Sequence, residues 1–166
     1  MRIDDGKNER ENLVVNSDVI KQMRQSALLL LSRREYSRVE LEQRLTKIDG
    51  AQPYLTQVLE QLRQQGLQSD LRYAQSLLRS RISRGQGPVR IAQELRHKGV
   101  DSALKDEVMV ACDQDWFELA RSVRERRFGL AAPEDRRAQA KQQRFLLYRG
   151  FTQDQLRYAM SEPDPD

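Results

Sequence analysis

The stretch RIAQELRHKG at residues 90–99 decides the fold, because a segment of the same pattern, KQQRFLLYRG, follows at residues 141–150. At this offset of 51 residues, Gly99 aligns with Gly150. Each stretch has helical spacing of its apolar residues and ends in a basic residue followed by glycine, which is typical of a helix and its C-terminal stop. The chain is therefore predicted to repeat a helical unit.

The repeat extends in both directions from these two segments. ELEQRL at residues 40–45 matches residues 90–95 at an offset of 50, and the helices that precede the two quoted stretches align at an offset of 46. This spacing predicts an all-α fold of three tandem three-helix repeats, stacked as an array. The predicted divisions are a disordered N-terminal tail (1–16), repeats at 17–66, 67–112 and 113–160, and a flexible acidic tail (161–166).

Capping signals mark where individual helices begin. Ser37 precedes Glu40 by three residues, the spacing of a capping box, and Asp101 and Thr152 stand before further apolar-periodic segments. Trp116 opens the first helix of the third repeat, where we expect it to be a core anchor. No alternating pattern of a strand is present in the sequence.

Composition favours a thin or elongated body over a compact sphere. The chain has 166 residues, of which 38% are hydrophobic and 33% charged. Of its 29 basic residues, 23 are arginine. Because arginine presents a planar fork of donors to phosphate and carboxylate, this bias points to an anionic partner. A coding bias, or Arg–Glu pairs on solvated faces, explains the same counts.

Several function classes are excluded by what the chain lacks. One cysteine (Cys112) allows no disulfide within the chain, and Cys112 with the one histidine (His97) is too few for a zinc site of those residues. His97 is expected to be exposed and Cys112 half-buried. The longest apolar run, residues 27–31, is too short to cross a membrane. We therefore predict a cytoplasmic protein with no membrane contact, no cofactor, no metal and no enzymatic activity.

Basic residues are concentrated in the second and third repeats. Residues 67–99 carry seven basic and two acidic side chains, and residues 121–149 carry nine and three. Four residues at i, i+4, i+7 and i+11 share one face of the predicted helix at 134–149, where three cations and an aromatic suit a phosphate backbone and a stacked base. A solvated face is the alternative. The predicted DNA- or filament-binding residues are Arg72, Arg79, Arg81, Arg84, Arg90, Lys98, Arg137, Lys141, Arg144, Tyr148 and Arg149.

The loop between the first two helices of the second repeat has two interpretations. Its sequence, RGQG at residues 84–87, places two glycines where backbone amides could approach a phosphate. A simple turn between helices explains the same residues, and the Lys-Ser/Thr pair of a P-loop is missing. In the following helix, Arg90 and Glu94 lie at i, i+4 and are predicted to pair.

These motifs resemble those of the RecX family, bacterial regulators of the RecA recombinase. DLRYAQSLLRSR at residues 70–81 and RGQGPVRIAQELRHKG at residues 84–99 are similar to the central signature of the family. KQQRFLLYRGF at residues 141–151 resembles its last block, and SRVELEQRL at residues 37–45 resembles the motif of its first repeat. Together the similar segments span roughly residues 20–160.

The resemblance implies a fold and a function. Members of the family are all-helical, with three three-helix repeats that form a curved, elongated body. They bind in the groove of the RecA–single-stranded DNA filament and inhibit its ATPase, strand-exchange and coprotease activities in DNA repair and the SOS response. They also bind single- and double-stranded DNA without strong sequence preference, and they need no cofactor. We expect the same of this chain, acting as a monomer.

Two other functions remain open at this stage. A DNA-binding protein of the helix-turn-helix type would also contain glycine-broken helix pairs and basic helices. A plain helical adaptor for another protein would share the repeats but would not bind the recombinase filament. Binding that depends on salt but not on sequence separates the first alternative from the filament regulator.

Overall fold

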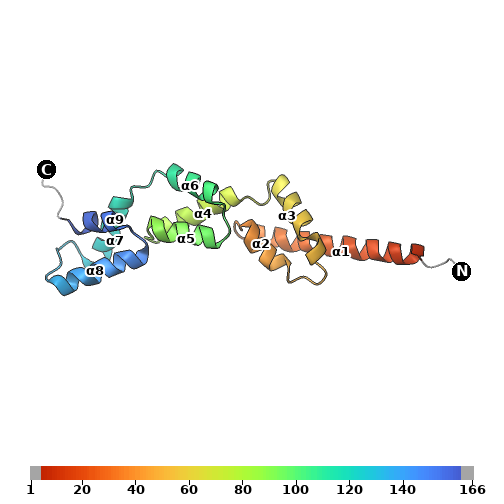
Figure 1. Ribbon diagram of the computed structural model, residues 1–166, viewed down its shortest axis with the longest axis horizontal. Coiled ribbons are helices and arrows are strands. Elements are labelled where there is room, and N and C mark those ends of the chain that lie inside the picture. The colour runs from red at the N-terminus through yellow and green to blue at the C-terminus, as the bar shows by residue number, and fades with distance from the viewer. Residues whose placement is uncertain (1–4, 162–166) are drawn as a thin grey trace. The chain divides into compact units, whose positions relative to one another are not determined.

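In the computed structural model, which describes residues 5–161, every element of regular secondary structure is helical (Figure 1). This confirms the predicted all-α fold. The helices are α1 (Asp5–Leu31), α2 (Arg38–Leu45), the short 3-10 helix η1 (Gln52–Tyr54), α3 (Leu55–Gln64), α4 (Asp70–Ser83), α5 (Pro88–His97), α6 (Ser102–Ala111), α7 (Trp116–Phe128), α8 (Arg136–Arg149) and α9 (Gln153–Met160). None of these helices is both long and apolar enough to cross a membrane.

The chain divides into two compact units, the first ending at Tyr73 and the second beginning at Ala74. In the first unit, α1, α2 and α3 contribute apolar side chains to one core. Met23 from α1, Leu41 and Leu45 from α2, and Leu62 from α3 are fully buried there. Burying each such side chain contributes roughly 1.5–3 kcal/mol, so this apolar contact is what holds the two short helices α2 and α3 against the longer α1.

The second unit contains the α5 to α9 helices and most of α4. Ile91 and Leu95 of α5 are fully buried. A core of α7, α8 and α9 contains Val123, Leu146 and Phe151, and α7 and α9 pack closely together. The aligned pair Leu95 and Leu146 are both fully buried, as expected of equivalent positions in a repeat. The exact limits of the three repeats stay a prediction.

The predicted caps are present. The Ser37 hydroxyl accepts a hydrogen bond from the Glu40 amide at 3.1 Å, and the Glu40 carboxylate accepts one from the Ser37 amide at 3.2 Å. Thr152 and Gln155 form the same reciprocal box at the start of α9. Asp101 caps α6 by accepting from the Ala103 amide at 3.0 Å. These contacts satisfy amides that a helix leaves without partners at its N-terminus, so they fix where each helix begins.

The structure differs from two expectations. Residues 5–16, predicted to be disordered, belong to α1. No proline interrupts that segment, and a helix extends at low cost once its C-terminal half is packed. Residues 1–4 and 162–166 lie outside the described residues. Trp116 is half-buried rather than a core anchor, because it is the first residue of α7 and the buried face of that helix begins at Ala120.

Candidate nucleic-acid interface

One face of α8 carries the four residues that the sequence spacing predicted to lie together. Asp135 caps this helix by accepting from the Ala138 amide at 2.7 Å, and Gly150 ends it in the left-handed conformation with φ of +94°. The helix is therefore fixed at both ends, and its buried side is set by Leu146. The α8 stripe, as we call the exposed face, consists of Arg137, Lys141, Arg144 and Tyr148.

The α8 stripe is accessible along its length. All four of its side chains are exposed, Tyr148 to 75%. Arg137, Lys141 and Arg144 line a shallow hollow together with Asp135, whose carboxylate is occupied by the cap. Within residues 5–161, none of the three cations forms an ion pair with a carboxylate. Within that range, the stripe therefore presents three cations without an ion-pair partner, with the Asp135 carboxylate as the one negative charge that lines the same hollow.

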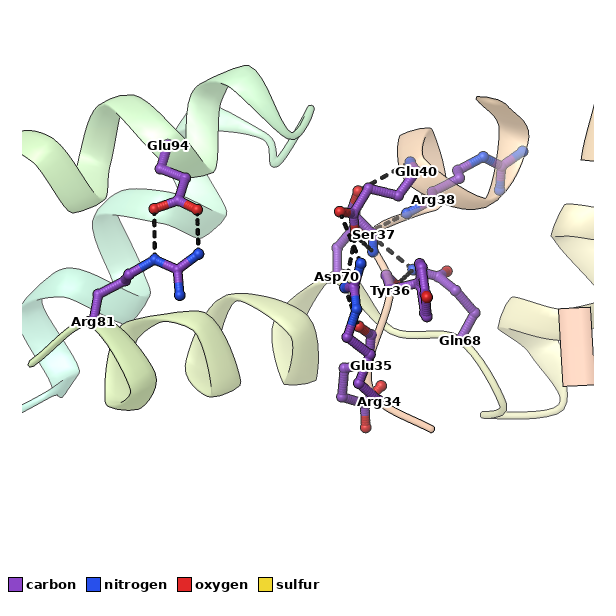
Figure 2. A network of polar contacts seen from close by, with 10 residues as sticks. All are labelled: Arg34, Glu35, Tyr36, Ser37, Arg38, Glu40, Gln68, Asp70, Arg81 and Glu94. Atoms are coloured by element: carbon purple, nitrogen blue, oxygen red, sulfur yellow. Dashed lines mark hydrogen bonds and ion pairs between the residues drawn. The ribbon is translucent and has the colours of Figure 1, made fainter. Parts of the chain in front are cut away.

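Arg90 extends this surface from α5 instead of pairing within its own helix. Its guanidinium carbon lies 5.1 Å from the centroid of the Tyr148 ring, and its Nη1 donates to the Tyr148 carbonyl at 3.2 Å. The predicted Arg90–Glu94 pair is wrong. Glu94 is held by Arg81, whose Nε and Nη2 donate to the two carboxylate oxygens at 2.8 and 2.6 Å (Figure 2).

The Arg81–Glu94 pair forms because a two-bond fork between helices is stronger than the contact available at i, i+4. The hydrogen bond from Arg81 lowers the pKa of Glu94, since it favours the ionised carboxylate. Both side chains are about one fifth to one quarter exposed. Arg81 was a predicted binding residue, and the structure places it in an internal contact between α4 and α5.

The glycine loop after α4 is a packing contact and not a phosphate cradle. The Gly85 and Gln86 amides donate to carbonyls of α4, whereas the Gly87 amide donates to the Arg149 carbonyl at 2.7 Å and Val89 donates to the Gly150 carbonyl at 3.0 Å. A Cβ on Gly87 would lie 2.4 Å from the Gly150 carbonyl. The amides that a phosphate would need are therefore occupied, and Gly87 allows the end of α8 to approach the start of α5.

Arg72 belongs to the first unit and has an internal role there. Its Nε donates to Glu35 at 2.9 Å and its Nη2 to the Gly66 carbonyl at 2.8 Å. Beside it, Asp70 accepts from the Arg38 amide and from the Gln68 side chain, both at 2.9 Å (Figure 2). This network fixes the loop before α2 against the start of α4, so Arg72 is less available to a ligand than the sequence suggested.

The other predicted residues lie in the second unit in different settings. Arg79 and Arg84 are exposed, while Lys98 and Arg149 are half-buried. Two further arginines, Arg126 and Arg127 of α7, were missed by the sequence reasoning. They line a hollow of about 240 Å³ together with Arg84 and Arg149. We call this feature the arginine hollow; the RERR run at residues 124–127 was the available signal.

The two residues expected to be chemically inert are placed as predicted. His97 is exposed on α5, and Cys112 is half-buried at the end of α6, where its Sγ lies 3.1 Å from the Met109 carbonyl. Within the described residues, no group of three or more His, Cys, Asp or Glu side chains is arranged to hold a metal ion.

Comparison with known proteins identifies the family of this chain. Residues 69–109 match the family model "RecX, second three-helix domain", and residues 113–160 match "RecX, third three-helix domain". Regulatory protein RecX of Halorhodospira halophila is 49% identical over 144 residues, which cover 87% of this chain and 89% of that protein. Regulatory protein RecX of Vibrio vulnificus is 39% identical, with coverage of 82% and 90%.

Two crystal structures agree with these sequence matches. RecX from Lactobacillus salivarius superposes with a TM-score of 0.72 at 25% identity, covering 86% of this chain and 95% of that one. A second structure of a regulatory protein RecX gives a TM-score of 0.79 at 26% identity, with coverage of 98% and 81%. With two matching domain models and relatives of nearly full length, this chain belongs to the RecX family of regulatory proteins.

Proposed function

We propose that this protein is a negative regulator of the RecA recombinase. It binds in the groove of the RecA–single-stranded DNA filament and inhibits the ATPase, strand-exchange and coprotease activities of that filament during DNA repair and the SOS response. Membership of the RecX family supports the proposal. The protein acts by binding alone, as a cytoplasmic monomer that requires no cofactor.

The observation that carries the proposal is the α8 stripe. Three exposed cations without a carboxylate partner end at Tyr148, which is 75% exposed. Cations at this spacing follow a phosphate backbone, and an exposed ring stacks on a base of any sequence. A nucleoprotein filament repeats its anionic surface along its length. Several weak contacts to it are linked, so together they bind far more tightly than any one of them.

Groove binding explains inhibition without catalysis. A filament hydrolyses ATP through movements of neighbouring recombinase subunits, and a body lodged in the groove opposes those movements. Because this chain contains tandem three-helix domains, one molecule contacts more than one subunit. Inhibition is therefore expected at well below one regulator per recombinase subunit.

The test is a titration of this protein into RecA pre-assembled on single-stranded DNA, with ATP hydrolysis measured at two salt concentrations. We expect saturating inhibition at a substoichiometric ratio and weaker inhibition at the higher salt, because ions screen contacts to phosphate and carboxylate. Full ATPase activity at a one-to-one ratio in low salt would refute the proposal. Inhibition that disappears whenever free single strand is in excess would show competition for DNA instead.

Footprinting on duplex DNA of random sequence distinguishes the filament regulator from a DNA-binding protein of the helix-turn-helix type. The filament regulator gives protection that depends on salt and shows no defined site. A defined protected site would favour the helix-turn-helix alternative, in which base edges are read by one helix in the major groove. A plain adaptor would not sediment with the recombinase filament at all.

A further inference from the structure

The arginine hollow gathers four arginines from three parts of the second unit. Arg84 follows the end of α4, Arg126 and Arg127 belong to the last turn of α7, and Arg149 is the last residue of α8. They surround one open hollow of about 240 Å³. Arg126 and Arg127 are neighbours on α7, but Arg84 and Arg149 come from other elements. The four arginines therefore meet only because these elements pack together.

The hollow is built by close backbone packing. Gly85 has a φ of +71°, and a Cβ at this position would lie 2.7 Å from a methyl group of Val123 on α7. Glycine therefore allows the loop after α4 to contact α7. The Nη1 of Arg149 donates to the Arg84 carbonyl at 2.9 Å, which joins the end of α8 to the same loop. These contacts fix the relative positions of the elements that carry the arginines.

The partners of these arginines are uncharged. The guanidinium carbon of Arg149 lies 5.2 Å from the centroid of the Phe145 ring, and that of Arg127 lies 5.7 Å from the Phe128 ring. Arg126 contacts the Ser122 carbonyl through its Nε at 3.4 Å. Rings and carbonyls orient a guanidinium but leave its charge in place.

No carboxylate lines the hollow, and none of the four arginines forms an ion pair with a carboxylate within the described part of the chain. Other arginines of the same unit do pair with carboxylates, Arg81 with Glu94, Arg121 with Glu118 and Arg157 with Asp154, so the lack of an acidic partner among the described residues sets the hollow apart. Four like charges around one small space repel one another, and an anion bound between them removes that repulsion. Guanidinium groups match the geometry of phosphate oxygens, since each offers two parallel donors.

We propose that the arginine hollow is a binding site for a phosphate group. The phosphate comes either from the backbone of a DNA strand or from a free polyphosphate. The site lies outside the α8 stripe and needs no recombinase to form, so it goes beyond the proposed function. It adds a second anion contact at the point where α4, α7 and α8 meet.

The test compares two double variants with the same change in net charge. Arg126→Gln with Arg127→Gln removes two guanidiniums from the hollow. Arg33→Gln with Arg96→Gln removes two exposed arginines that do not line it. Arg84→Gln alone is a second hollow variant, because the contact from Arg149 uses the Arg84 backbone carbonyl and survives the change. Circular dichroism and urea unfolding establish that each variant is folded.

Two probes distinguish the sources of the phosphate. Binding of a fluorescent oligothymidylate is followed by anisotropy, and binding of inorganic pyrophosphate is followed by calorimetry at constant ionic strength. We expect the variant with Arg126→Gln and Arg127→Gln to bind the probe that occupies the hollow about tenfold more weakly than the control variant does, because two charge-assisted contacts are lost. A specific loss for the oligonucleotide alone assigns the site to strand phosphates. A specific loss for pyrophosphate as well assigns it to free polyphosphate.

Equal affinities of the hollow and control variants for both probes would overturn the proposal. Because neither probe contains RecA, this outcome is independent of the ATPase titration. If the protein inhibits the filament but the hollow variants show no specific loss of affinity for either probe, the proposed function stands and only the proposed phosphate site is refuted.

Discussion

Arginines in the two units of this protein have different partners. In the first unit, four arginines pair with carboxylates: Arg34, Arg38, Arg63 and Arg72. Glu60 accepts hydrogen bonds from both Arg63 and Arg38. These bonds lower the pKa of Glu60 to about 2, and the one from Arg63 has the larger effect. Arg34 pairs with Glu40 and Arg72 with Glu35. The charge of these four arginines is therefore offset within the fold, whereas Arg10 and Arg33 of the same unit are exposed.

Within the described residues, four arginines of the second unit lie over aromatic rings, against one in the first unit, Arg34 over Tyr36. Arg90 lies over Tyr148 and Arg149 over Phe145. Some arginines of this unit do have carboxylate partners: Arg81 pairs with Glu94, Arg121 with Glu118 and Arg157 with Asp154. A ring attracts a guanidinium without cancelling its charge, so Arg90 and Arg149 keep their positive charge. Counting basic residues therefore does not locate an interface, because the partner of each basic residue decides whether its charge is available.

The largest expected effect comes from disrupting the backbone contact between the start of α5 and the end of α8, which positions Arg90 and Arg149. Gly87→Ala introduces a Cβ 2.4 Å from the Gly150 carbonyl group, and the clash disturbs the hydrogen bonds from Gly87 and Val89. We expect the free energy of unfolding to fall by about 3 kcal/mol, as for an overpacked core position. Urea denaturation followed by circular dichroism measures it.

Gly66→Ala is the control for the Gly87→Ala substitution. Gly66 lies in the turn after α3, with a φ of +70°, and a Cβ there meets nothing within 4 Å. Only backbone strain of about 1–2 kcal/mol is expected. If Gly87→Ala costs no more than this control, the contact between α5 and α8 is not tight, and the placement of Arg90 over Tyr148 loses its support.

The next effect is on binding, through the α8 stripe. Replacing Arg137, Lys141 and Arg144 together by glutamate reverses the charge of the exposed face. We expect at least about a thirtyfold loss of affinity for single-stranded DNA at low salt, and a salt dependence shallower by about two units of slope, because three phosphate contacts are removed. Anisotropy at several salt concentrations measures both.

Three exposed cations of the first unit form the control for that reversal: Arg10, Lys21 and Arg33, each replaced by glutamate. The net charge changes equally, so a purely non-specific electrostatic effect gives the same loss. Equal losses in the two triple variants would show that the α8 stripe is solvated surface and has no particular role. Exposed substitutions change stability by only about ±0.5 kcal/mol each, so both proteins should stay folded.

Local features of this fold could be predicted from the sequence, and contacts between helices could not. The Ser37–Glu40 box was predictable because both partners lie three residues apart. The partner of Glu94 was not, because the rule for neighbours on one helix says nothing about Arg81, which reaches it from α4. Prediction from spacing finds contacts within a helix and misses the competing contact between helices.

The candidate site divides in the same way. The α8 stripe was predicted because one helix holds all four of its members. The arginine hollow was not, since Arg126 and Arg127 join Arg84 only through tertiary packing. The two glycines of RGQG fit either a phosphate loop or a close approach of backbones. Only the position of the Gly150 carbonyl decides between these interpretations.

A smaller effect concerns pH and the Arg81–Glu94 pair. The hydrogen bond from Arg81 lowers the pKa of Glu94 in the folded state, so folding favours the ionised carboxylate. The resulting stability is present above the ordinary carboxyl pKa of about 4.5 and is lost as the pH falls through the lower, folded-state pKa. Glu94→Gln should therefore destabilise the protein at pH 7 by about 1–2 kcal/mol. The difference from the wild type should shrink in acid; a difference independent of pH would mean that the pair contributes only packing.

The smallest expected effect is that of Arg72→Gln. Arg72 was among the predicted binding residues, but its guanidinium is held by Glu35 and by the Gly66 carbonyl. The pair with Glu35 is partly exposed, with side chains 43% and 30% accessible, so its loss should cost at most about 1 kcal/mol of stability. We expect the affinity for single-stranded DNA to change by less than about twofold, which is below the contribution of one phosphate contact. A double-mutant cycle with Glu35→Gln measures the coupling by urea denaturation, and anisotropy measures the affinity of the same proteins. If Arg72→Gln weakens DNA binding as much as replacement of Arg144 alone does, then an arginine that already has a carboxylate partner also binds DNA. The contrast between the two units would then fail, because partner identity would no longer separate internal arginines from those left for an anion.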